Sequence, residues 1–380
     1  MLSVFKPRLP LTSDLIPYLE KIDSNRWYSN FGPLHEEFRQ KLAIHFGLGI
    51  DQVALASNAT VGLALTLEAV SLKRPSKQCI CPSWTFAATP HAIIQAGMSP
   101  VFLDVDENSW DLNSEQLDEK DFAESSAITV VSPFGQPVNL TKWEKFVERY
   151  GVPVVCDAAA SFDAVGKLPT FNIGSIPIVI SLHATKTLPA GEGAIILCSD
   201  PDLIERIRQM SNFGFSTTSV AQTIGTNAKL SEYACAVGLA SLQNWQQTRD
   251  ILLKKTKFYR AGLKNIPSVE VFGSNTNFVA NYLIIETKQD SYQLSNFLRE
   301  RKIDTRRWWR SGCHNHPAFS SYNVKPLPIT KRLASHSLGL PFFLDITEED
   351  IESVINAVAE FSYKNNLLSD NLKNTYSVDI

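Results

Sequence analysis

Val154-Val-Cys-Asp157 and Ser181-Leu-His-Ala-Thr-Lys186 are the two segments that decide the fold and the chemistry expected of this chain. The first is an apolar run that ends in a carboxylate. The second follows another apolar run and carries a serine and a lysine. This layout favours a pyridoxal phosphate (PLP) site, in which the lysine would form a Schiff base with the cofactor. The aspartate would keep the pyridine nitrogen protonated, so that the ring can act as an electron sink.

The composition indicates a globular protein with a large and a smaller domain, since 44% of the 380 residues are hydrophobic and 20% are charged. The net charge of −3 gives no reason to expect a nucleic acid or an anionic membrane as partner. We expect no signal peptide and no membrane span, because no apolar run is long enough. The six scattered cysteines predict buried free thiols in a reducing compartment, the cytoplasm.

Short apolar runs alternate with helical patterns in the first half of the chain, which predicts βαβ units and a mostly parallel sheet covered on both faces. Helices are expected at 34–47, 61–72, 88–97 and 141–150. Strands are expected at 53–57, 78–81, 100–104, 127–131, 152–156, 176–181 and 194–198. Ligands on such sheets bind at the carboxyl ends of the strands. Ser57, Asp157 and Ser181 all lie at such ends.

The pattern changes after about residue 245, where a smaller α/β domain is expected. We predict a large domain over 1–245, a small domain over 246–365 and a tail over 366–380. One long helical stretch is expected at 233–263 and strands near 278–286. Two further helices are expected at 291–302 and 347–362.

Ser57-Asn58-Ala59-Thr60 forms a strand-to-helix turn that would present backbone N–H groups to a phosphate. Ordinary N-capping of the helix is the alternative. The hydroxyl of Ser181 could add another phosphate contact. The small residues in Gly191-Glu-Gly193 would let a cofactor approach Lys186, although an exposed loop lysine is the commoner fate of this residue type.

Aromatic and basic residues supply candidates for contacts with the cofactor and the substrate. Trp84 and Phe86 follow a strand, and either one stacks on a pyridine ring or both pack in the core. His183 contacts cofactor or substrate, or is structural. Arg306-Arg-Trp-Trp-Arg310-Ser-Gly-Cys-His-Asn-His316 would suit a nucleotide-linked substrate. Structural ion pairs are the alternative there, and the spacing of Cys313, His314 and His316 is not a standard zinc pattern, so no metal is expected.

A series of motifs, in order along the chain from about residue 26 to 360, resembles one known family. They are Trp27-Tyr-Ser-Asn-Phe-Gly32-Pro, Ser57-Asn-Ala-Thr60, Pro82-Ser-Trp-Thr-Phe86, Pro100-Val-Phe-Leu-Asp-Val-Asp106, Asp157-Ala-Ala, Ser181-Leu-His-Ala-Thr-Lys186, Gly191-Glu-Gly193, Gly225-Thr-Asn227-Ala-Lys-Leu-Ser-Glu232 and Leu340-Pro341. The chain resembles the DegT/DnrJ/EryC1/StrS sugar aminotransferases. This resemblance implies the aspartate aminotransferase-like fold (fold type I), an α/β fold with a large mostly parallel-sheet domain and a smaller C-terminal α/β domain.

The resemblance also implies roles for individual residues. Lys186 and Asp157 would be catalytic, Phe86 would stack on the ring, and Ala59, Thr60 and Ser181 would hold the phosphate. Asn227 would reach the phosphate of the neighbouring subunit, so a homodimer is expected. The residues assigned to substrate binding are Tyr28, Asn30, Trp84, His183, Arg306, Trp308, His314 and His316.

Three positions depart from the family pattern: Ala59 and Ala194 replace glycine, and Ala160 replaces a glutamine near the cofactor hydroxyl. His183 is expected to take over the contact of that glutamine. Together, Ala160 and His183 indicate a subgroup that makes amino-dideoxy sugars on dTDP. The presence of Lys186 argues against the dehydratase branch of the family, which lacks this lysine.

The resemblance therefore predicts a PLP-dependent aminotransferase that uses glutamate and dTDP-4-keto-6-deoxyglucose and gives a 4-amino-4,6-dideoxysugar, as in O-antigen synthesis. The alternatives are amination at C3, another fold-type I activity such as a lyase or dehydratase, and a non-catalytic regulator that binds PLP or sugar nucleotide.

Overall fold

The computed structural model describes residues 1–376 apart from 73, 75, 217 and 275, with side chains described up to Lys364. Its centre is an eight-stranded sheet with the order β1-β7-β6-β5-β4-β2-β3-β10. The strands are β1 (Val53–Ala56), β2 (Gln78–Pro82), β3 (Ser99–Leu103), β4 (Ser125–Val131), β5 (Val154–Asp157), β6 (Ile178–Ser181), β7 (Ala194–Leu197) and β10 (Asn323–Val324). The seven strands predicted in this half of the chain are thereby confirmed.

The direction of β7 determines which strand ends meet. It runs antiparallel to both of its neighbours, β1 and β6, whereas the other pairs of the sheet are parallel. β1 therefore points the same way as β5 and β6. The carboxyl ends of these three strands lie along one edge, as expected for Ser57, Asp157 and Ser181.

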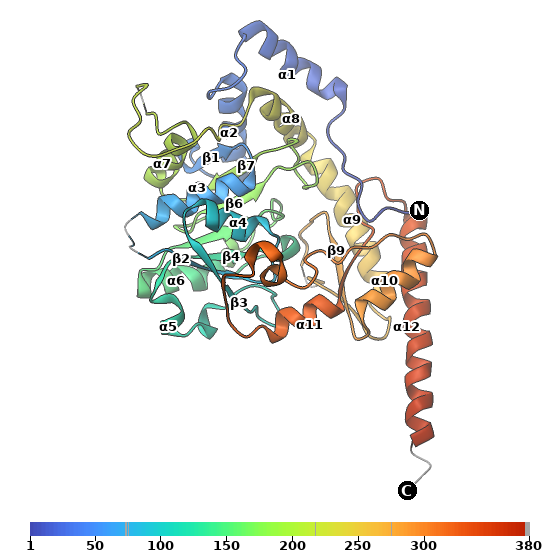
Figure 1. Ribbon diagram of the computed structural model, residues 1–380. Coiled ribbons are helices and arrows are strands. Elements are labelled where there is room, and N and C mark those ends of the chain that lie inside the picture. Colours follow the sequence, from blue (N-terminus) through green and yellow to red (C-terminus); the bar gives the residue numbers. More distant parts are fainter. Residues whose placement is uncertain (73, 75, 217, 275, 377–380) are drawn as a thin grey trace.

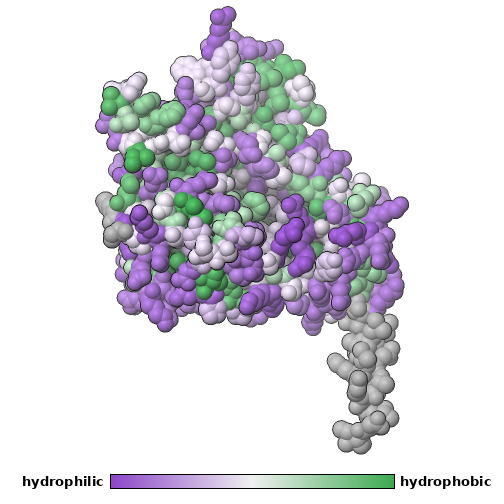
Figure 2. All heavy atoms as spheres, viewed as in Figure 1, coloured by the Kyte–Doolittle hydropathy of each residue, from purple (hydrophilic) through white to green (hydrophobic). Residues whose placement is uncertain are grey.

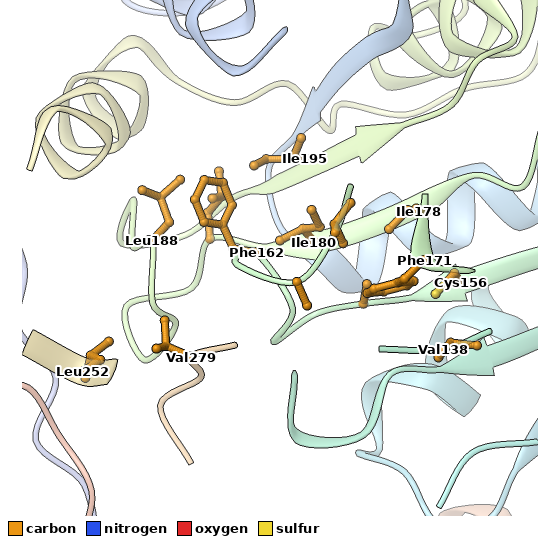
Figure 3. Close-up of a cluster of buried hydrophobic side chains, with 14 of the residues drawn as sticks. Val138, Cys156, Phe162, Phe171, Ile178, Ile180, Leu188, Ile195, Leu252 and Val279 are labelled. Atoms are coloured by element: carbon orange, nitrogen blue, oxygen red, sulfur yellow. The ribbon is translucent and has the colours of Figure 1, made fainter. Parts of the chain in front are cut away.

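Helices cover both faces of this sheet (Figure 1). They are α1 (Thr12–Asn25), α2 (Pro33–Phe46), α3 (Ala59–Ser71), α4 (Ala88–Gln95), α5 (Glu119–Phe122), α6 (Leu140–Tyr150), α7 (Pro201–Ser211) and α8 (Glu232–Gln243). Alternate residues of a strand face opposite sides. Val155 accordingly packs in the cluster of α3, α4 and α7, while Val154 and Cys156 pack in the larger cluster on the other face. Figure 3 shows the larger cluster, in which Ile180 and Leu188 lie near Phe162.

The second part of the fold is a three-stranded antiparallel sheet with the order β11-β9-β8, formed by β8 (Val269–Val271), β9 (Leu283–Thr287) and β11 (Ser337–Leu340). Around it lie α9 (Trp245–Leu263), α10 (Ser291–Glu300), α11 (Pro328–His336) and α12 (Glu348–Tyr376). The domain limits at 245 and 365 stay predictions. None of the helices in the described part of the chain combines the length and apolar character needed to cross a bilayer.

Two expected elements differ from the structure. The stretch 233–263 is not one helix, because Asn244 leaves helical geometry at φ −94° and ψ 6° and separates α8 from α9. The last helix does not end near 362 but continues to Tyr376, so most of the predicted tail is helical, and residues 377–380 lie outside the described part. All six cysteines are buried free thiols, as predicted.

Glu232 joins the start of α8 to the start of α2. Its carboxylate is 1% exposed and accepts the backbone N–H groups of Leu34 and His35, both at 2.8 Å. The first N–H groups of a helix have no partner within the helix. Gly32, just before α2, is needed for this approach, because a Cβ there would lie 2.7 Å from Glu232 Cδ. The backbone N–H of Glu232 also donates to the carbonyl of Tyr28 at 3.0 Å, so the loop that contains Trp27–Gly32 is held near both ends.

Replacing Glu232 with alanine should lower the free energy of unfolding by about 2 kcal/mol, because two buried N–H groups lose their acceptor. Glu232→Gln should cost less, since the amide keeps one acceptor oxygen. The measurement is the urea midpoint at one protein concentration, with the exposed Glu300→Ala as control. Equal midpoints for Glu232→Ala and the control would contradict the capping role.

Candidate active site

Asp157 is the buried carboxylate at the end of β5. Thr89 Oγ1 donates to its Oδ2 at 2.7 Å, and the backbone N–H of Ala159 donates to its Oδ1 at 3.2 Å. Thr85 supports Thr89 through a hydroxyl contact of 2.8 Å. Burial raises the pKa of the Asp157 carboxyl, and its hydrogen bonds and the charge of Lys186 offset this only in part. Each oxygen retains acceptor capacity for one more donor.

Lys186 lies in the loop between β6 and β7. The loop is closed by hydrogen bonds from Leu182 N to Gly193 O at 2.9 Å and from Ala184 N to Gly191 O at 2.8 Å. Lys186 Nζ donates to the hydroxyl of Tyr282 at 3.1 Å. The Nζ atom also lies 5.4 Å from the centroid of the Tyr282 ring. Lys186 is therefore a loop lysine with a defined partner, close enough to Asp157 for their charges to interact.

The turn after β1 contains two backbone N–H groups without a hydrogen-bond partner among the described residues. Asn58 caps α3: its side-chain oxygen accepts from Val61 N at 3.0 Å, and its carbonyl accepts from Gly62 N at 2.9 Å. In the described part of the chain, the N–H groups of Ala59 and Thr60 have no such partner. They lie at the positive end of the helix dipole, which suits a phosphate. Capping and phosphate binding, posed as alternatives from the sequence, are compatible because they use different N–H groups.

Ser181 and His183 lie at the end of β6 and at the start of the lysine loop. Ser181 Oγ accepts from His183 N at 3.2 Å, so this hydroxyl can still donate. His183 Nδ1 accepts from the backbone N–H of Thr185 at 3.2 Å and contacts its hydroxyl at 2.8 Å. His183 Nε2 lies 3.5 Å from Glu192 Oε1. The ring of His183 therefore holds its own loop, and a cofactor contact in place of the missing glutamine stays a prediction.

The two aromatic residues after β2 have different environments. Phe86 is 62% exposed, which leaves its ring free to stack on a ligand. Trp84 is 1% exposed and packs edge-on against Trp309, with centroids 5.2 Å apart. For Trp84 the structure favours core packing, the alternative that the sequence left open.

The segment 306–316 packs against the end of β2. His314 Nδ1 lies 2.6 Å from Ser83 Oγ, and Cys313 Sγ donates to Thr85 O at 3.1 Å. His316 stacks on Phe319 at 6.0 Å. Arg306 lies over the ring of Trp308, 4.5 Å from its centroid. Among the described side chains, no three His, Cys, Asp or Glu are grouped to hold a metal. The cysteine and the histidines are instead engaged with neighbouring groups.

The remaining predicted residues, Tyr28, Asn30 and Asn227, are exposed. Tyr28 is 49% exposed and stacks on Tyr233 with centroids 6.4 Å apart. Asn30 is exposed with a φ of 60°. Asn227 is exposed as well, and pairs with Asn212 in an isolated bridge. Its neighbour Ala228 accepts the N–H of Ser57 at 2.7 Å, beside the open end of α3.

Sequence reasoning missed four residues of this site. Thr89 and Thr85 orient Asp157, Tyr282 contacts Lys186, and Asn281 Nδ2 donates to Thr185 O at 2.9 Å. Thr85 lies in the quoted motif Pro82–Phe86, which was a signal for it, and Thr89 follows that motif by three residues. No motif marks Asn281 or Tyr282, because they lie just before β9 in a segment predicted to be strand.

These groups fit PLP. A buried carboxylate with a raised pKa gains most from a cationic N–H donor such as a protonated pyridine nitrogen. The open amides of Ala59 and Thr60 match a phosphate, and the amine of Lys186 matches an aldehyde.

Comparison with known proteins decides the family. The model of the DegT/DnrJ/EryC1/StrS aminotransferase family matches residues 11–359. This chain belongs to that family. The aminotransferase is 28% identical over 369 residues to dTDP-4-amino-4,6-dideoxy-D-glucose transaminase from Escherichia coli, with 92% of this chain and 96% of that protein covered.

Two solved structures have the same fold. One is a protein described as a PLP-dependent aminotransferase from Bacillus cereus ATCC 10987, with a TM-score of 0.87, 28% identity, and coverage of 94% of this chain and 99% of that one. The other is DesI in the presence of its TDP-sugar product, with a TM-score of 0.86, 31% identity, and coverage of 98% and 95%. The predictions of the family, of the α/β aminotransferase fold and of PLP as cofactor are confirmed.

Asp157→Asn should weaken PLP binding by this aminotransferase about 10- to 100-fold, because a charge-assisted hydrogen bond contributes roughly 1.5–3 kcal/mol. Without cofactor, the variant should be at least as stable as the parent at pH 7. The raised pKa of Asp157 means that the cofactor-free protein loses stability as pH rises through that value, and the amide removes this loss. PLP titration and melting curves at pH 4 and pH 7 measure both effects.

The exposed Asp23→Asn is the matched control for this variant. Unchanged PLP affinity in Asp157→Asn would contradict the role of Asp157.

Proposed function

We propose that this aminotransferase moves an amino group from glutamate to dTDP-4-keto-6-deoxyglucose, which gives a 4-amino-4,6-dideoxysugar. The observation that carries the proposal is the meeting of Lys186, Asp157 and the open start of α3 at one edge of the sheet. The E. coli relative is named for the transamination of dTDP-4-amino-4,6-dideoxy-D-glucose, and DesI was solved with a TDP-sugar product. Both names support a dTDP-linked substrate here.

Each residue of the site has a role that follows from its contacts. When bound, PLP supplies an electron sink for the carbon that loses or gains a proton. Asp157, oriented by Thr89, would hold the pyridine N–H. The amides of Ala59 and Thr60 and the hydroxyl of Ser181 would hold the phosphate. Lys186 Nζ would anchor the cofactor and then carry the proton at the reacting carbon.

We assign the recognition of the nucleotide-sugar to the exposed and half-buried side chains near the end of β2. Among the described residues, the side chains of Arg306 and His316 have observed contacts only with aromatic rings, so their polar side-chain atoms can meet a diphosphate. The Nε2 atom of His314 has the same freedom, because its Nδ1 atom makes the contact with Ser83. Tyr28 and Asn30 lie on an exposed loop and complete the proposed substrate set.

Lys186→Ala should abolish amino transfer, a fall of at least about 10²–10⁴ in rate, and leave the fold intact. The measurement pairs the absorbance of the purified protein with the release of 2-oxoglutarate, which should equal the amino sugar formed. NMR of the product distinguishes amination at C4 from amination at C3. The exposed Lys264→Ala serves as control. Normal turnover by Lys186→Ala would make the assignment wrong, and PLP binding without turnover in the parent would favour the regulator.

We also propose a homodimer in which Asn227 serves the site of the neighbouring subunit. Large apolar side chains are exposed near α8 and in the loop after α7, including Trp27, Tyr233 and Ile224, the last at 80%. Figure 2 shows hydrophobic residues at the surface in this upper part of the molecule. Such a surface is typical of an interface. The cytoplasm is the proposed compartment, supported by the six free thiols.

Mixed dimers test the role of Asn227 directly. Lys186→Ala and Asn227→Ala subunits, each weak or inactive alone, should regain activity when mixed, because one of the two sites then has both its lysine and its asparagine. The assay compares the activity of the mixture with that of each variant, after dimer formation is checked by sedimentation. No recovery in a stable mixed dimer would show that Asn227 serves the site of its own subunit, which its proximity to Ser57 allows.

A further inference from the structure

Among the described residues, Lys186 Nζ makes one side-chain hydrogen bond, to Tyr282, which lies directly before β9. We propose that Tyr282 is the positioning residue of the Lys186 amine: its hydroxyl holds Nζ at the site, and its ring limits where the lysine chain can move. The inference rests on the proposed role of Lys186. Tyr282 lies outside every quoted motif and, in this role, orients the Lys186 amine, the group that would carry the proton.

The segment that carries Tyr282 is attached at two further points to the loops that follow β5 and β6. Asp163, which is fully buried, accepts the N–H of Val279 at 3.0 Å, and Asn281 donates to the carbonyl of Thr185 at 2.9 Å. Val279 also lies in the buried cluster that contains Leu188, two residues after Lys186 (Figure 3). The lysine loop and the tyrosine segment are therefore fixed against the same core.

The ring of Tyr282 is fixed as well. Phe134 packs at a steep angle of 66° with centroids 5.8 Å apart, and Trp308 packs edge-on at 86° and 4.9 Å. The indole of Trp308 can take this position only because residue 339 is glycine, since a Cβ on Gly339 would lie 2.3 Å from Trp308 Nε1. Trp308, predicted to bind substrate, thus has a structural contact with the tyrosine that meets the lysine.

A fixed acceptor is useful at this point because lysine is a flexible side chain. Its ammonium group ends a stem of four carbons, and ordering such a chain costs side-chain conformational entropy. The Tyr282 hydroxyl accepts one N–H at 3.1 Å, and Nζ lies beyond this hydroxyl, 5.4 Å from the ring centroid. This hydrogen bond restricts Nζ before any substrate arrives, which lowers the cost of reaching the reacting carbon.

Tyr282→Phe removes the hydroxyl and keeps the ring. We expect kcat to fall about 10- to 100-fold, the effect of a misplaced reacting group, while KM for the amino donor changes little. We also expect the visible band of the PLP-loaded protein to titrate at a lower pH, because the hydroxyl favours the protonated nitrogen by accepting its hydrogen. The spectral titration reads the environment of the lysine nitrogen without turnover.

The matched control is Tyr292→Phe, which removes a hydroxyl from an exposed ring, 55% accessible, on α10. Tyr282→Leu, which also removes the ring, should lower kcat further and weaken the protein. If Tyr282→Phe keeps the parent kcat and the parent titration midpoint, the proposal is overturned. If kcat falls with no spectral shift and a raised KM, Tyr282 binds substrate and does not position Lys186, and the proposal fails as well.

Borohydride reduction followed by peptide mapping separates this proposal from the function on which it rests. If PLP is attached to Lys186 in both the parent and Tyr282→Phe, the proposed role of Lys186 holds. The spectral and kinetic comparison then decides the role of Tyr282. PLP found on another residue removes the assigned role of Lys186 and, with it, the present inference.

Discussion

The antiparallel placement of β7 between β1 and β6 is the constraint on which the site depends. Because β7 reverses direction, β1 points the same way as β6 although the two are not neighbours. The open start of α3 therefore meets Asp157 and Ser181 at one edge. The same reversal makes the connection between β6 and β7 a closed loop, held by Leu182 and Ala184, and this loop presents Lys186. One strand thus places both the phosphate end and the lysine.

Burying the carboxylate of Asp157 at this edge of the sheet also costs free energy. Transferring a charged group from water to an apolar site is costly unless it is paired. Thr89 and the amide of Ala159 stabilise Asp157, yet its pKa stays above the ordinary value because burial outweighs them. The protein alone therefore does not fully stabilise the charged form of Asp157, and a cationic N–H donor would supply the missing stabilisation. A structural aspartate would be expected to have its full set of partners from the chain itself.

The sequence predicts β1 to β7 of the large sheet well because these strands are mostly buried, so they appear as apolar runs. It does not predict the short edge strand β10, whose two residues are exposed. It does not predict α1, because Pro17 lies inside that helix and Ile22 is its one buried residue. The break at Asn244 is missed for the opposite reason, since helical periodicity continues on both sides of it. The residues expected to hold the pyridine nitrogen and the phosphate, and the lysine itself, can be predicted from strand ends and motifs. The neighbours that orient them depend on tertiary contacts between residues that are distant in the chain.

His183 illustrates how a position that fits a motif can take a different local role. The sequence predicts that His183 takes over the cofactor contact of the glutamine that Ala160 replaces. In the structure, the Nδ1 atom of His183 accepts from the backbone N–H of Thr185, and its Nε2 atom faces Glu192. Thr185 is also the residue whose carbonyl accepts from Asn281. The residue before Lys186 is thus held from both sides, by a ring inside the loop and by an amide from the segment before β9. Lys186 and Tyr282 each directly follow one member of this Thr185–Asn281 pair. The hydrogen bond from the Asn281 side chain to the Thr185 carbonyl therefore also helps to set the distance between the lysine amine and the tyrosine hydroxyl.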